Sequence, residues 1–557
     1  MRVISSLLLS FFLGLCALAQ SPINMTNLKI RVERPDRIRE PASPGGSNCY
    51  DGKDNYFNEV QTGTSTFMGY SANGSKTSTI ASTCRIQGTQ PADMSGSVTQ
   101  TIYPTTHYPG APSYGSCGLW LNGSYITRNG DGTINTIYGF AHAETACSYP
   151  ATTKSMAMLT SNDGQNWSLV SQIIANPSNV HANSDSGEGD CTPVVFNNHV
   201  QLYCRRATVG TSTVGRSPLT NCTPIFSPGC WRKWNGPTSG WSSLWNADDA
   251  DLTTAASTGH TNPSNRFGSS ASIWTTTNNV VLLNASVAKA SGAPNYCSDP
   301  TVTSVGGVKI SFSWNSDGSG FDMLNEPILC EDDHLFDTAS TFGDLIVYPS
   351  AINPADGSQN WTNSFELSYQ YVPNTLESKN TGDVNERTLV MRQVSASIET
   401  NQQTPHVGVA ISRWYNSTAD QRISSVQAVP SNLAGTALNY EVKNGYTMTV
   451  PPDPSVDSNP RAVVECISTS GGANPEHLMT FKTNGQLPTE CNGTGHVFLR
   501  SAGWLYSVST VPNTQAVYRC HAGSNGTYHY TSLQSDCEVG AIPSAVKDFT
   551  LGYALSN

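Results

Sequence analysis

Apolar and polar residues alternate along this chain with the period of β-strands. The clearest case is residues 137–145, IYGFAHAET, because successive side chains of a strand point to opposite faces. One face then carries two aromatic rings, an imidazole and an acid, and the other carries only small residues. The two sets are Tyr138, Phe140, His142 and Glu144 on the first face, and Gly139, Ala141 and Ala143 on the second.

Such strands recur in units of roughly seventy residues, a period typical of repeat architectures. Each unit has an apolar β run, a turn, and a second β run that ends near small or acidic residues. The units cover residues 50–105, 112–175, 185–248, 264–330 and 343–400. Repeats of this length with several strands each are typical of propeller blades. The pattern predicts an all-β protein with a five-bladed β-propeller over residues 46–404.

Two hairpin turns favour the same interpretation. Residues 161–167 follow the pattern S-x-D-G-x-x-W, and residues 315–321 are a weaker copy of it. The Asp-Gly pair suits a tight turn, and the aromatic residue packs between adjacent sheets. The turns resemble the Asp boxes of sialidases and the blade hairpins of arabinanase, xylosidase and levanase type glycoside hydrolases. We expect a structural role for both turns.

Residues 406–557 repeat with a shorter period and predict a β-trefoil-like module of three copies, each of about fifty residues. Three similar endings stand at residues 445–449 (GYTMT), 503–507 (GWLYS) and 552–556 (GYALS). Upstream of them, and in register, stand residues 412–414 (SRW), 464–466 (VEC) and 518–520 (YRC). The match resembles short repeat modules appended to secreted enzymes. We expect a separable module with a supporting binding role.

The N-terminus and the cysteines predict secretion. Arg2 precedes an apolar run over residues 3–18, and Ala17-Leu18-Ala19 supplies a cleavage site, so residues 1–19 are expected to be a signal peptide. No later apolar run approaches the ~20 residues of a membrane helix. Fourteen cysteines remain without Cys16, an even number that suits disulfide bonds. The natural pairs in the C-terminal copies are Cys466 with Cys491 and Cys520 with Cys537.

Composition narrows the possible partners. The formal net charge is −11, charged residues make up 13%, and no Lys/Arg cluster is visible, which argues against nucleic acid and anionic membranes as partners. We expect a monomer. Residues 20–45 carry Pro35, Pro41 and Pro44 amid charges, and are predicted to form an irregular lead-in. Sequons such as those at Asn73 and Asn284 would be glycosylated only in a eukaryotic host.

Carboxylates in two strands could cleave a glycosidic bond. This reaction needs one carboxylic acid to protonate the leaving oxygen, and a second carboxylate to activate water or to attack the sugar directly. Glu188-Gly189-Asp190 precedes the strand TPVVFNNHVQLYC. This resembles the Glu-Gly-Pro stretch of the arabinanase/xylosidase class, in which the Glu is the general acid; here Asp190 replaces the Pro. In an extended segment Glu188 and Asp190 share a face, roughly 6.6 Å apart. The alternative is a turn whose carboxylates cap backbone amides.

Glu144 is the candidate for the second carboxylate. His142 would bind sugar hydroxyls or modulate a pKa. We expect Glu144 to face Glu188 and Asp190 across a pocket at the propeller axis, with a raised pKa for one carboxyl of this set. The alternative is a half-exposed strand end. Asp54, with Asp51, lies where the first blade of this family would place its water-activating Asp, although the surrounding residues do not match.

Two further residues could bind substrate. Arg205 ends a strand, with surface or inter-blade ion pairing as the alternative role. Tyr348 could offer a ring for stacking on a sugar, or serve the fold alone. Asp332, Asp333 and His334 fit no standard zinc spacing, so we expect no metal and no cofactor.

The sequence thus favours a secreted glycoside hydrolase acting on a polysaccharide or oligosaccharide. A non-enzymatic, lectin-like protein and a polysaccharide lyase with His142 or a Tyr as base are the alternatives. Glycine and nucleophile patterns of the common rival enzymes, such as G-x-S-x-G, H-E-x-x-H and the P-loop, do not occur.

Overall fold

The computed structural model is built almost entirely of β-strands. It describes residues 23–39, 113–146, 152–177, 186–206, 211–250, 269–289, 304–331, 345–372, 388–399, 406–426, 438–469 and 476–556, apart from a few positions inside these ranges, and the backbone of four strands between residues 58 and 101. The predicted signal peptide, Asp51, Asp54 and residues 332–334 lie outside the described residues. No helix in the described part of the chain is long and apolar enough to cross a membrane.

Successive groups of antiparallel strands follow one another along residues 58–398, and they follow the units expected from the sequence repeat, except that β21 (Asn360–Trp361) of the last unit joins the group before it. The first group is β2 (Asn58–Gly63), β3 (Thr66–Asn73), β4 (Ser82–Gly88) and β5 (Val98–Thr101). The second is β6 (Gly118–Arg128), β7 (Ile134–Glu144), β8 (Thr153–Ser161) and β9 (Ser168–Ile174). The third is β10 (Ser186–Phe196), β11 (His199–Arg206), β12 (Thr211–Pro218), β13 (Arg232–Lys233) and β14 (Ser243–Leu244).

Two more groups complete this half of the molecule. One contains β15 (Ser269–Trp274), β16 (Asn279–Lys289), β17 (Ser304–Ser313), β18 (Phe321–Met323) and β19 (Leu329–Glu331), with β21 (Asn360–Trp361) added at its edge. The other contains β20 (Leu345–Ile352), β22 (Ser364–Val372) and β23 (Thr388–Ile398). A short parallel contact between β8 and β10, at Ser186↔Thr153 and Gly187↔Lys154, joins the second group to the third.

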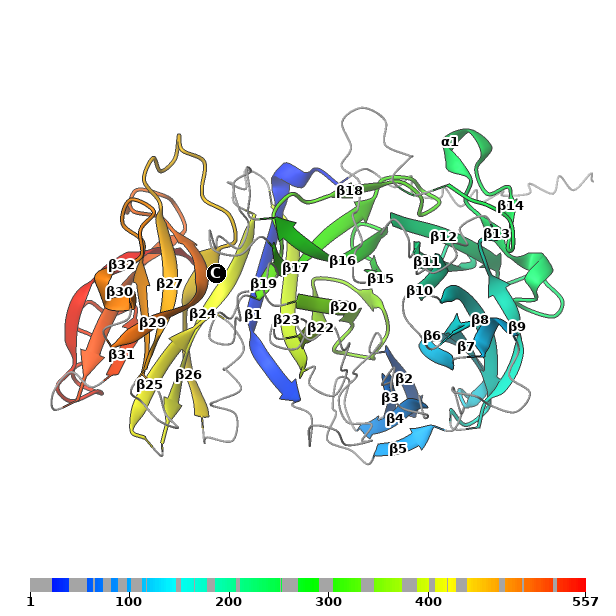
Figure 1. Ribbon diagram of the computed structural model, residues 1–557, viewed down its shortest axis with the longest axis horizontal. Coiled ribbons are helices and arrows are strands. Elements are labelled where there is room, and N and C mark those ends of the chain that lie inside the picture. Colours follow the sequence, from blue (N-terminus) through cyan, green and yellow to red (C-terminus); the bar gives the residue numbers. More distant parts are fainter. Residues whose placement is uncertain are drawn as a thin grey trace, which may run out of the picture.

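The expected irregular lead-in over residues 20–45 is wrong for residues 28–39, because β1 (Leu28–Arg39) is a twelve-residue strand. It pairs antiparallel with β23 from Leu28↔Ile398 onward, and parallel with β24 (Val407–Asn416) at Ile30↔Val407. Its prolines obscured the strand in the sequence, and Pro35 indeed sits at a register shift, where proline is tolerated. In Figure 1, β1 lies between the earlier strand groups and the C-terminal strands.

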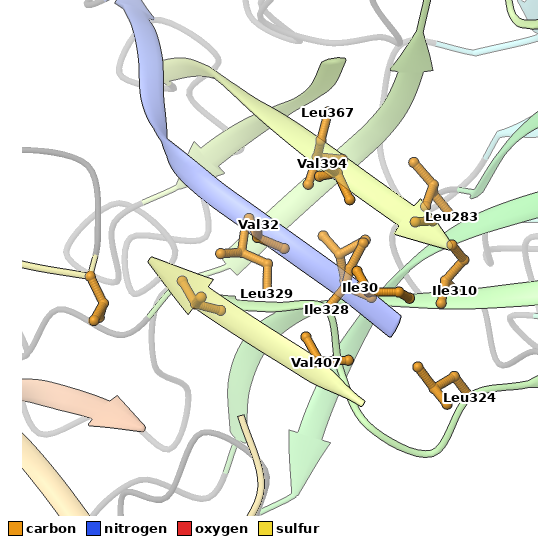
Figure 2. Packing of buried hydrophobic residues seen from close by; sticks show 14 of the residues in the cluster. Ile30, Val32, Leu283, Ile310, Leu324, Ile328, Leu329, Leu367, Val394 and Val407 are labelled. Carbon is orange, nitrogen blue, oxygen red and sulfur yellow. The ribbon is translucent and has the colours of Figure 1, made fainter. Parts of the chain in front are cut away.

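Side chains of β1 are at the centre of the largest apolar cluster. Leu28, Ile30 and Val32 are fully buried, and the cluster continues on one side to Leu367 and on the other to Val407. Figure 2 shows Ile30 and Val32 surrounded by side chains of both halves. The cluster extends into the C-terminal repeats through Val463, Ala502, Leu505, Val517, Leu551 and Ala554. The two halves therefore share one core.

Ion pairs reinforce this junction. The Glu326 carboxylate accepts hydrogen bonds from the backbone N–H groups of His406 and Val407, at 2.8 and 3.0 Å, and contacts His406 Nδ1 at 2.6 Å. On β1, Glu33 binds Lys443 Nζ at 2.9 Å. These contacts cross the expected domain boundary near residue 405. An excised fragment 406–557 would therefore lose the contacts with Glu326 and with Glu33.

The C-terminal strands form three similar triples, in each of which the first strand pairs with the other two. They are β24, β25 (Gln421–Ser425) and β26 (Leu438–Met448), then β27 (Arg461–Ser468), β28 (His477–Phe481) and β29 (His496–Leu505), and finally β30 (Thr514–Ala522), β31 (Tyr528–Ser532) and β32 (Val546–Leu555). The three sequence endings fall at equivalent positions, at Ala410↔Tyr446, Ala462↔Trp504 and Ala516↔Tyr553.

Four disulfide bonds are present among the described residues. Cys466–Cys491 and Cys520–Cys537 are the two predicted from spacing, and both predictions are confirmed. Cys191–Cys204 and Cys222–Cys230 lie in the third strand group and the segment that follows β12. Paired cysteines suit an oxidising compartment.

Replacement of Ile30 by Ala should destabilise the whole molecule, because this fully buried side chain belongs to the core shared by both halves. We expect a loss of about 2–5 kcal/mol in the free energy of unfolding, measured by urea denaturation. Ile398→Ala on the paired strand is the matched control, since Ile398 is 43% exposed and its truncation should cost little. Equal losses in both variants would contradict the shared core.

Candidate functional site

The alternation predicted for β7 is correct. Ala141 and Ala143 pack with Trp167 on one side, and Phe140 packs with Trp231 on the other. The tight packing of the small face is visible at Gly139, where an added Cβ would lie 2.5 Å from a side-chain carbon of Leu121. The turn at residues 161–167 has the structural role expected of it, since it delivers Trp167 to this cluster.

His142 connects two carboxylate-bearing segments. Its Nε2 lies 3.1 Å from Glu144 Oε1, and its Nδ1 accepts a hydrogen bond of 3.0 Å from the backbone N–H of Asp190. Because Nδ1 is an acceptor, the proton of a neutral imidazole is on Nε2 and is donated to Glu144. Gly189 permits this approach, since a Cβ there would lie 2.4 Å from Nδ1. The end of β7 is thereby fixed to the start of β10.

Glu188 and Asp190 do not share a face, contrary to the expectation from an extended segment. Asp190 has a left-handed φ of 52°, and the register of β10 with β11 shifts between Gly189 and Thr192. Such a bulge interrupts the alternation of side chains. Asp190 Oδ2 therefore lies 3.6 Å from Arg205 Nη1, whereas Glu188 Oε1 lies 3.5 Å from the neighbouring Arg206. Adjacent residues of a strand point to opposite faces.

Asp190 is a buried carboxylate held in its charged form. Burial by itself raises its pKa, but the electrostatic interactions with His142, Lys154 and Arg205 outweigh that effect and lower the pKa to about 2. Lys154 Nζ lies 3.8 Å from Asp190 Oδ2 and 3.9 Å from Glu144 Oε1. Glu144, with a side chain 14% exposed, and Asp190 thus share one ammonium group as well as one imidazole.

A second charged cluster lies on the other face of β10. Glu188 is completely buried, and its carboxylate accepts hydrogen bonds from Asn176 Nδ2 at 2.9 Å and Lys233 Nζ at 3.1 Å. Asp249 accompanies it, with Arg206 Nη2 at 2.5 Å and Lys233 Nζ at 3.5 Å. Two acids and two cations are therefore packed together without exposure of Glu188, Lys233 or the Asp249 carboxyl.

The two acids of this cluster have opposite pKa shifts. Burial, together with the negative charge of Glu188, raises the pKa of Asp249. For Glu188 burial also opposes ionisation, but Lys233 and the hydrogen bonds from Asp249 and Asn176 lower its pKa. Of the three carboxyls for which one raised pKa was expected, Glu188 and Asp190 have lowered pKa values, and for Glu144 the expectation stays a prediction. Asp249, whose pKa is raised, was not singled out from the sequence.

Four residues of the two clusters escaped the sequence analysis: Asn176, Lys154, Lys233 and Asp249. Lys154 is on β8 beside Glu144, a register position that follows only once β7 and β8 are paired. Lys233 is in the two-residue strand β13, and Asp249 follows β14 without regular structure. Asp248-Asp249 was visible as an acidic pair, but its partner lies some sixty residues earlier in β10 and no local pattern indicates it.

The other predicted site residues have different outcomes. Arg205 is 18% exposed and ion-pairs with Asp190 between the adjacent strands β10 and β11, a pair that is neither at the surface nor between strand groups; its role in binding substrate stays a prediction. Tyr348 is in β20 of another sheet, with a left-handed φ of 52° beside a register shift, and its stacking role stays a prediction. Asp54 lies outside the described residues. Among the described residues, the His and acidic side chains spaced to share a metal ion are elsewhere, at His521, His529 and Asp548.

The arrangement of strands is similar to that in solved glycoside hydrolases. The catalytic domain of a GH62 α-L-arabinofuranosidase from Coprinopsis cinerea is 9% identical, with a TM-score of 0.36 over 67% of this chain and 98% of that one. A glycosyl hydrolase from Bacteroides ovatus is 12% identical, with a TM-score of 0.38 over 67% and 96%. A thermostable family-43 glycoside hydrolase is 10% identical, with a TM-score of 0.33 over 61% and 91%.

The sequence itself matches no protein-family model and no curated protein. Overlap at the level of these structures does not establish an activity or a substrate. Those have to be argued from the residues of this chain.

Removal of the Lys233 ammonium should be strongly destabilising, because the Glu188 and Asp249 carboxyls would stay buried with one cation fewer. We expect Lys233→Met to lower the free energy of unfolding by about 3–5 kcal/mol in urea denaturation. Lys29→Met is the control, since Lys29 pairs with Glu399 at the surface and such pairs are worth about 0–1 kcal/mol. Similar small losses in both variants would show that the buried cluster is not a unit.

Asp190 should make stability depend on acidity. Its folded-state pKa of about 2 lies below the ordinary aspartate value of 3.8, so the stabilisation is present above the unfolded value and is lost as the pH falls toward 2. The size expected is about 2 kcal/mol. Unfolding free energies measured between pH 5 and 2 should fall less steeply in Asp190→Asn than in the parent protein. Parallel curves would contradict the assignment.

Proposed function

We propose that this chain is a secreted glycoside hydrolase whose residues 46–404, closed by β1, form a five-bladed β-propeller. The strand groups β2–β5, β6–β9, β10–β14, β15–β19 and β20–β23 with β1 supply the blades in this interpretation. The three C-terminal triples would form the β-trefoil-like module with a supporting role in binding carbohydrate. The proposed substrate is an oligosaccharide or polysaccharide.

One observation carries the proposal: two carboxylates from different strands are fixed around one imidazole and one ammonium group. Glycosidic bond cleavage uses two carboxyl groups with different tasks. Asp190 remains ionised because of Lys154, Arg205 and His142, which suits a base, a nucleophile or a stabiliser of positive charge. Glu144 is the more exposed carboxyl and receives a proton donor in His142 Nε2, which suits the group that exchanges protons with the substrate.

Glu188 has a different role in this proposal from the one that the family resemblance implies. A completely buried side chain whose carboxylate already contacts Lys233, Asn176 and Arg206 has no surface left for a sugar. Glu188 instead orients Arg206 and anchors the start of β10, next to the bulge that presents Asp190. It is a positioning residue. Arg205, which contacts Asp190 and is 18% exposed, is the proposed donor to sugar hydroxyls.

The proposal is tested by incubating the purified full-length protein with a panel of plant and microbial polysaccharides and measuring new reducing ends. Glu144→Gln and Asp190→Asn each keep side-chain shape and remove the acid. Each should lower the rate on the best substrate by about 10²–10⁴-fold, the usual contribution of one acid or base. Asp131→Asn is the matched control, because Asp131 lies in an exposed turn and caps Thr133.

The outcomes separate the alternatives. Full activity in both amide variants would refute this site, and products with a 4,5-unsaturated uronate would indicate a lyase. A carbohydrate-binding protein is the second candidate, since Asp190 is paired with cations and held ionised, an arrangement that also suits hydrogen bonding to hydroxyls. Retention of a labelled polysaccharide without new reducing ends would favour that second function.

A further inference from the structure

Two histidines and an aspartate converge in the third C-terminal triple, far along the chain from the carboxylates of β7 and β10. His521 on β30 is directly opposite His529 on β31, and their ring centroids lie 5.9 Å apart. Asp548 on β32 reaches both rings, with Oδ1 2.5 Å from His521 Nδ1 and Oδ2 3.5 Å from His529 Nε2. One nitrogen of each ring and one carboxylate oxygen lie within 4.8 Å of one another.

The second nitrogen of His529 is already engaged. Its Nδ1 bonds to Glu476 Oε1, and the other oxygen of Glu476 lies 3.1 Å from His496 Nε2. When Nδ1 donates its proton to Glu476, a neutral His529 directs the lone pair of Nε2 at an Asp548 oxygen. Two acceptors then face each other at 3.5 Å. A cation between them would convert this contact into two attractive ones, with Glu476 orienting His529 as carboxylates orient metal-bound histidines.

The residues at the equivalent positions of the other two triples show how a carboxylate at this position is balanced by charge. In the first triple Tyr415 faces Arg422, and Arg422 Nε lies 3.1 Å from both oxygens of Glu441, the residue at the bulge that corresponds to Asp548. The repeat there contains its own cation. In the second triple the corresponding residues are Ile467, His477 and Leu499, and there is no carboxylate to balance. The third triple retains the carboxylate and replaces the arginine by His529.

Charge around the third site also favours a dication. Asp548 and Glu490 both contact Arg519, and Glu476 adds a third carboxylate through His529. Three acids against one arginine leave two negative charges when the imidazoles are neutral. The side chains of His521, His529 and Asp548 are 30%, 18% and 17% exposed, so an ion can reach them from solvent.

We propose that His521, His529 and Asp548 form a binding site for a divalent transition-metal ion of the Zn²⁺ class. Imidazole nitrogen ligands select zinc, copper and nickel over calcium and magnesium, which prefer oxygen. Two histidines and one carboxylate are a known three-ligand set for zinc that leaves a coordination position open. The ion would tie β30, β31 and β32 together and offer its open position to a ligand at the surface of the module.

The test is calorimetric titration of the untagged, chelator-treated full-length protein with ZnCl₂. We expect one saturable site, which His521→Gln, His529→Gln and Asp548→Asn each abolish or weaken severely. Glu476→Gln, which removes only the residue that orients His529, should weaken binding by about 10–100-fold. Addition of Co²⁺ to the parent protein should produce d–d absorption bands that ZnCl₂ eliminates, a readout that requires no variant to fold.

The matched control is Glu441→Gln, which alters the corresponding carboxylate of the first triple and should leave the zinc affinity unchanged. Circular dichroism without metal checks that each variant is folded. The proposal is overturned by absence of saturable zinc binding, by absence of the cobalt bands, or by ligand variants that bind zinc as the parent does. Loss of zinc binding in Glu441→Gln would also count against it.

Discussion

Hydrogen bonding along both edges of β1 is the constraint on which the rest of the molecule depends. One edge completes the sheet of β20, β22 and β23, and the other edge receives β24, the first strand of the C-terminal triples. The side chains of the same strand fill the core between the halves. Glu326, which accepts the backbone N–H groups of His406 and Val407, fixes the chain where it leaves one half for the other. The halves therefore share a strand and a core, and whether residues 406–557 fold when separated, as expected from the sequence, stays a prediction.

The candidate site depends in turn on the ion pairs that lie on the buried face of β10. Glu188, Asp249, Lys233 and Arg206 contact one another on the buried face, and the bulge that follows Glu188 presents the Asp190 carboxylate on the opposite face. Removing one partner would leave a buried charge uncompensated, which costs far more than a surface pair. The buried cluster around Glu188 thus stabilises the strand that carries Asp190, although no sugar could reach Glu188 itself.

Strand periodicity explains what could be foreseen from the sequence and what could not. The two faces of β7 followed from alternation alone, and the groups of strands followed from the spacing of apolar runs. The face of β10 on which the Asp190 side chain lies could not be predicted from alternation, because a single left-handed residue at a bulge reverses the alternation of side chains. Asp249 and Lys233 lie in segments with hardly any regular structure, so their proximity to Glu188 depends on tertiary packing. β1 was missed because Pro35 and its neighbouring charges resemble a loop.

The position of β1 has a consequence for synthesis. The neighbouring strand β23, with which β1 pairs antiparallel, comes much later in the chain: Glu399, which follows β23 and ion-pairs with Lys29, lies 370 residues beyond it. At about 5–20 residues per second, a ribosome needs roughly 20–70 s to make that partner available. Until then the apolar side chains of Leu28, Ile30 and Val32 and both edges of β1 lack their partners, a state that favours association with other chains. Pairing at such sequence distance is also slow, because the loop must close before the contacts can form. Although β1 is synthesised first among these strands, it can therefore pair only after β23 and β24 have been made.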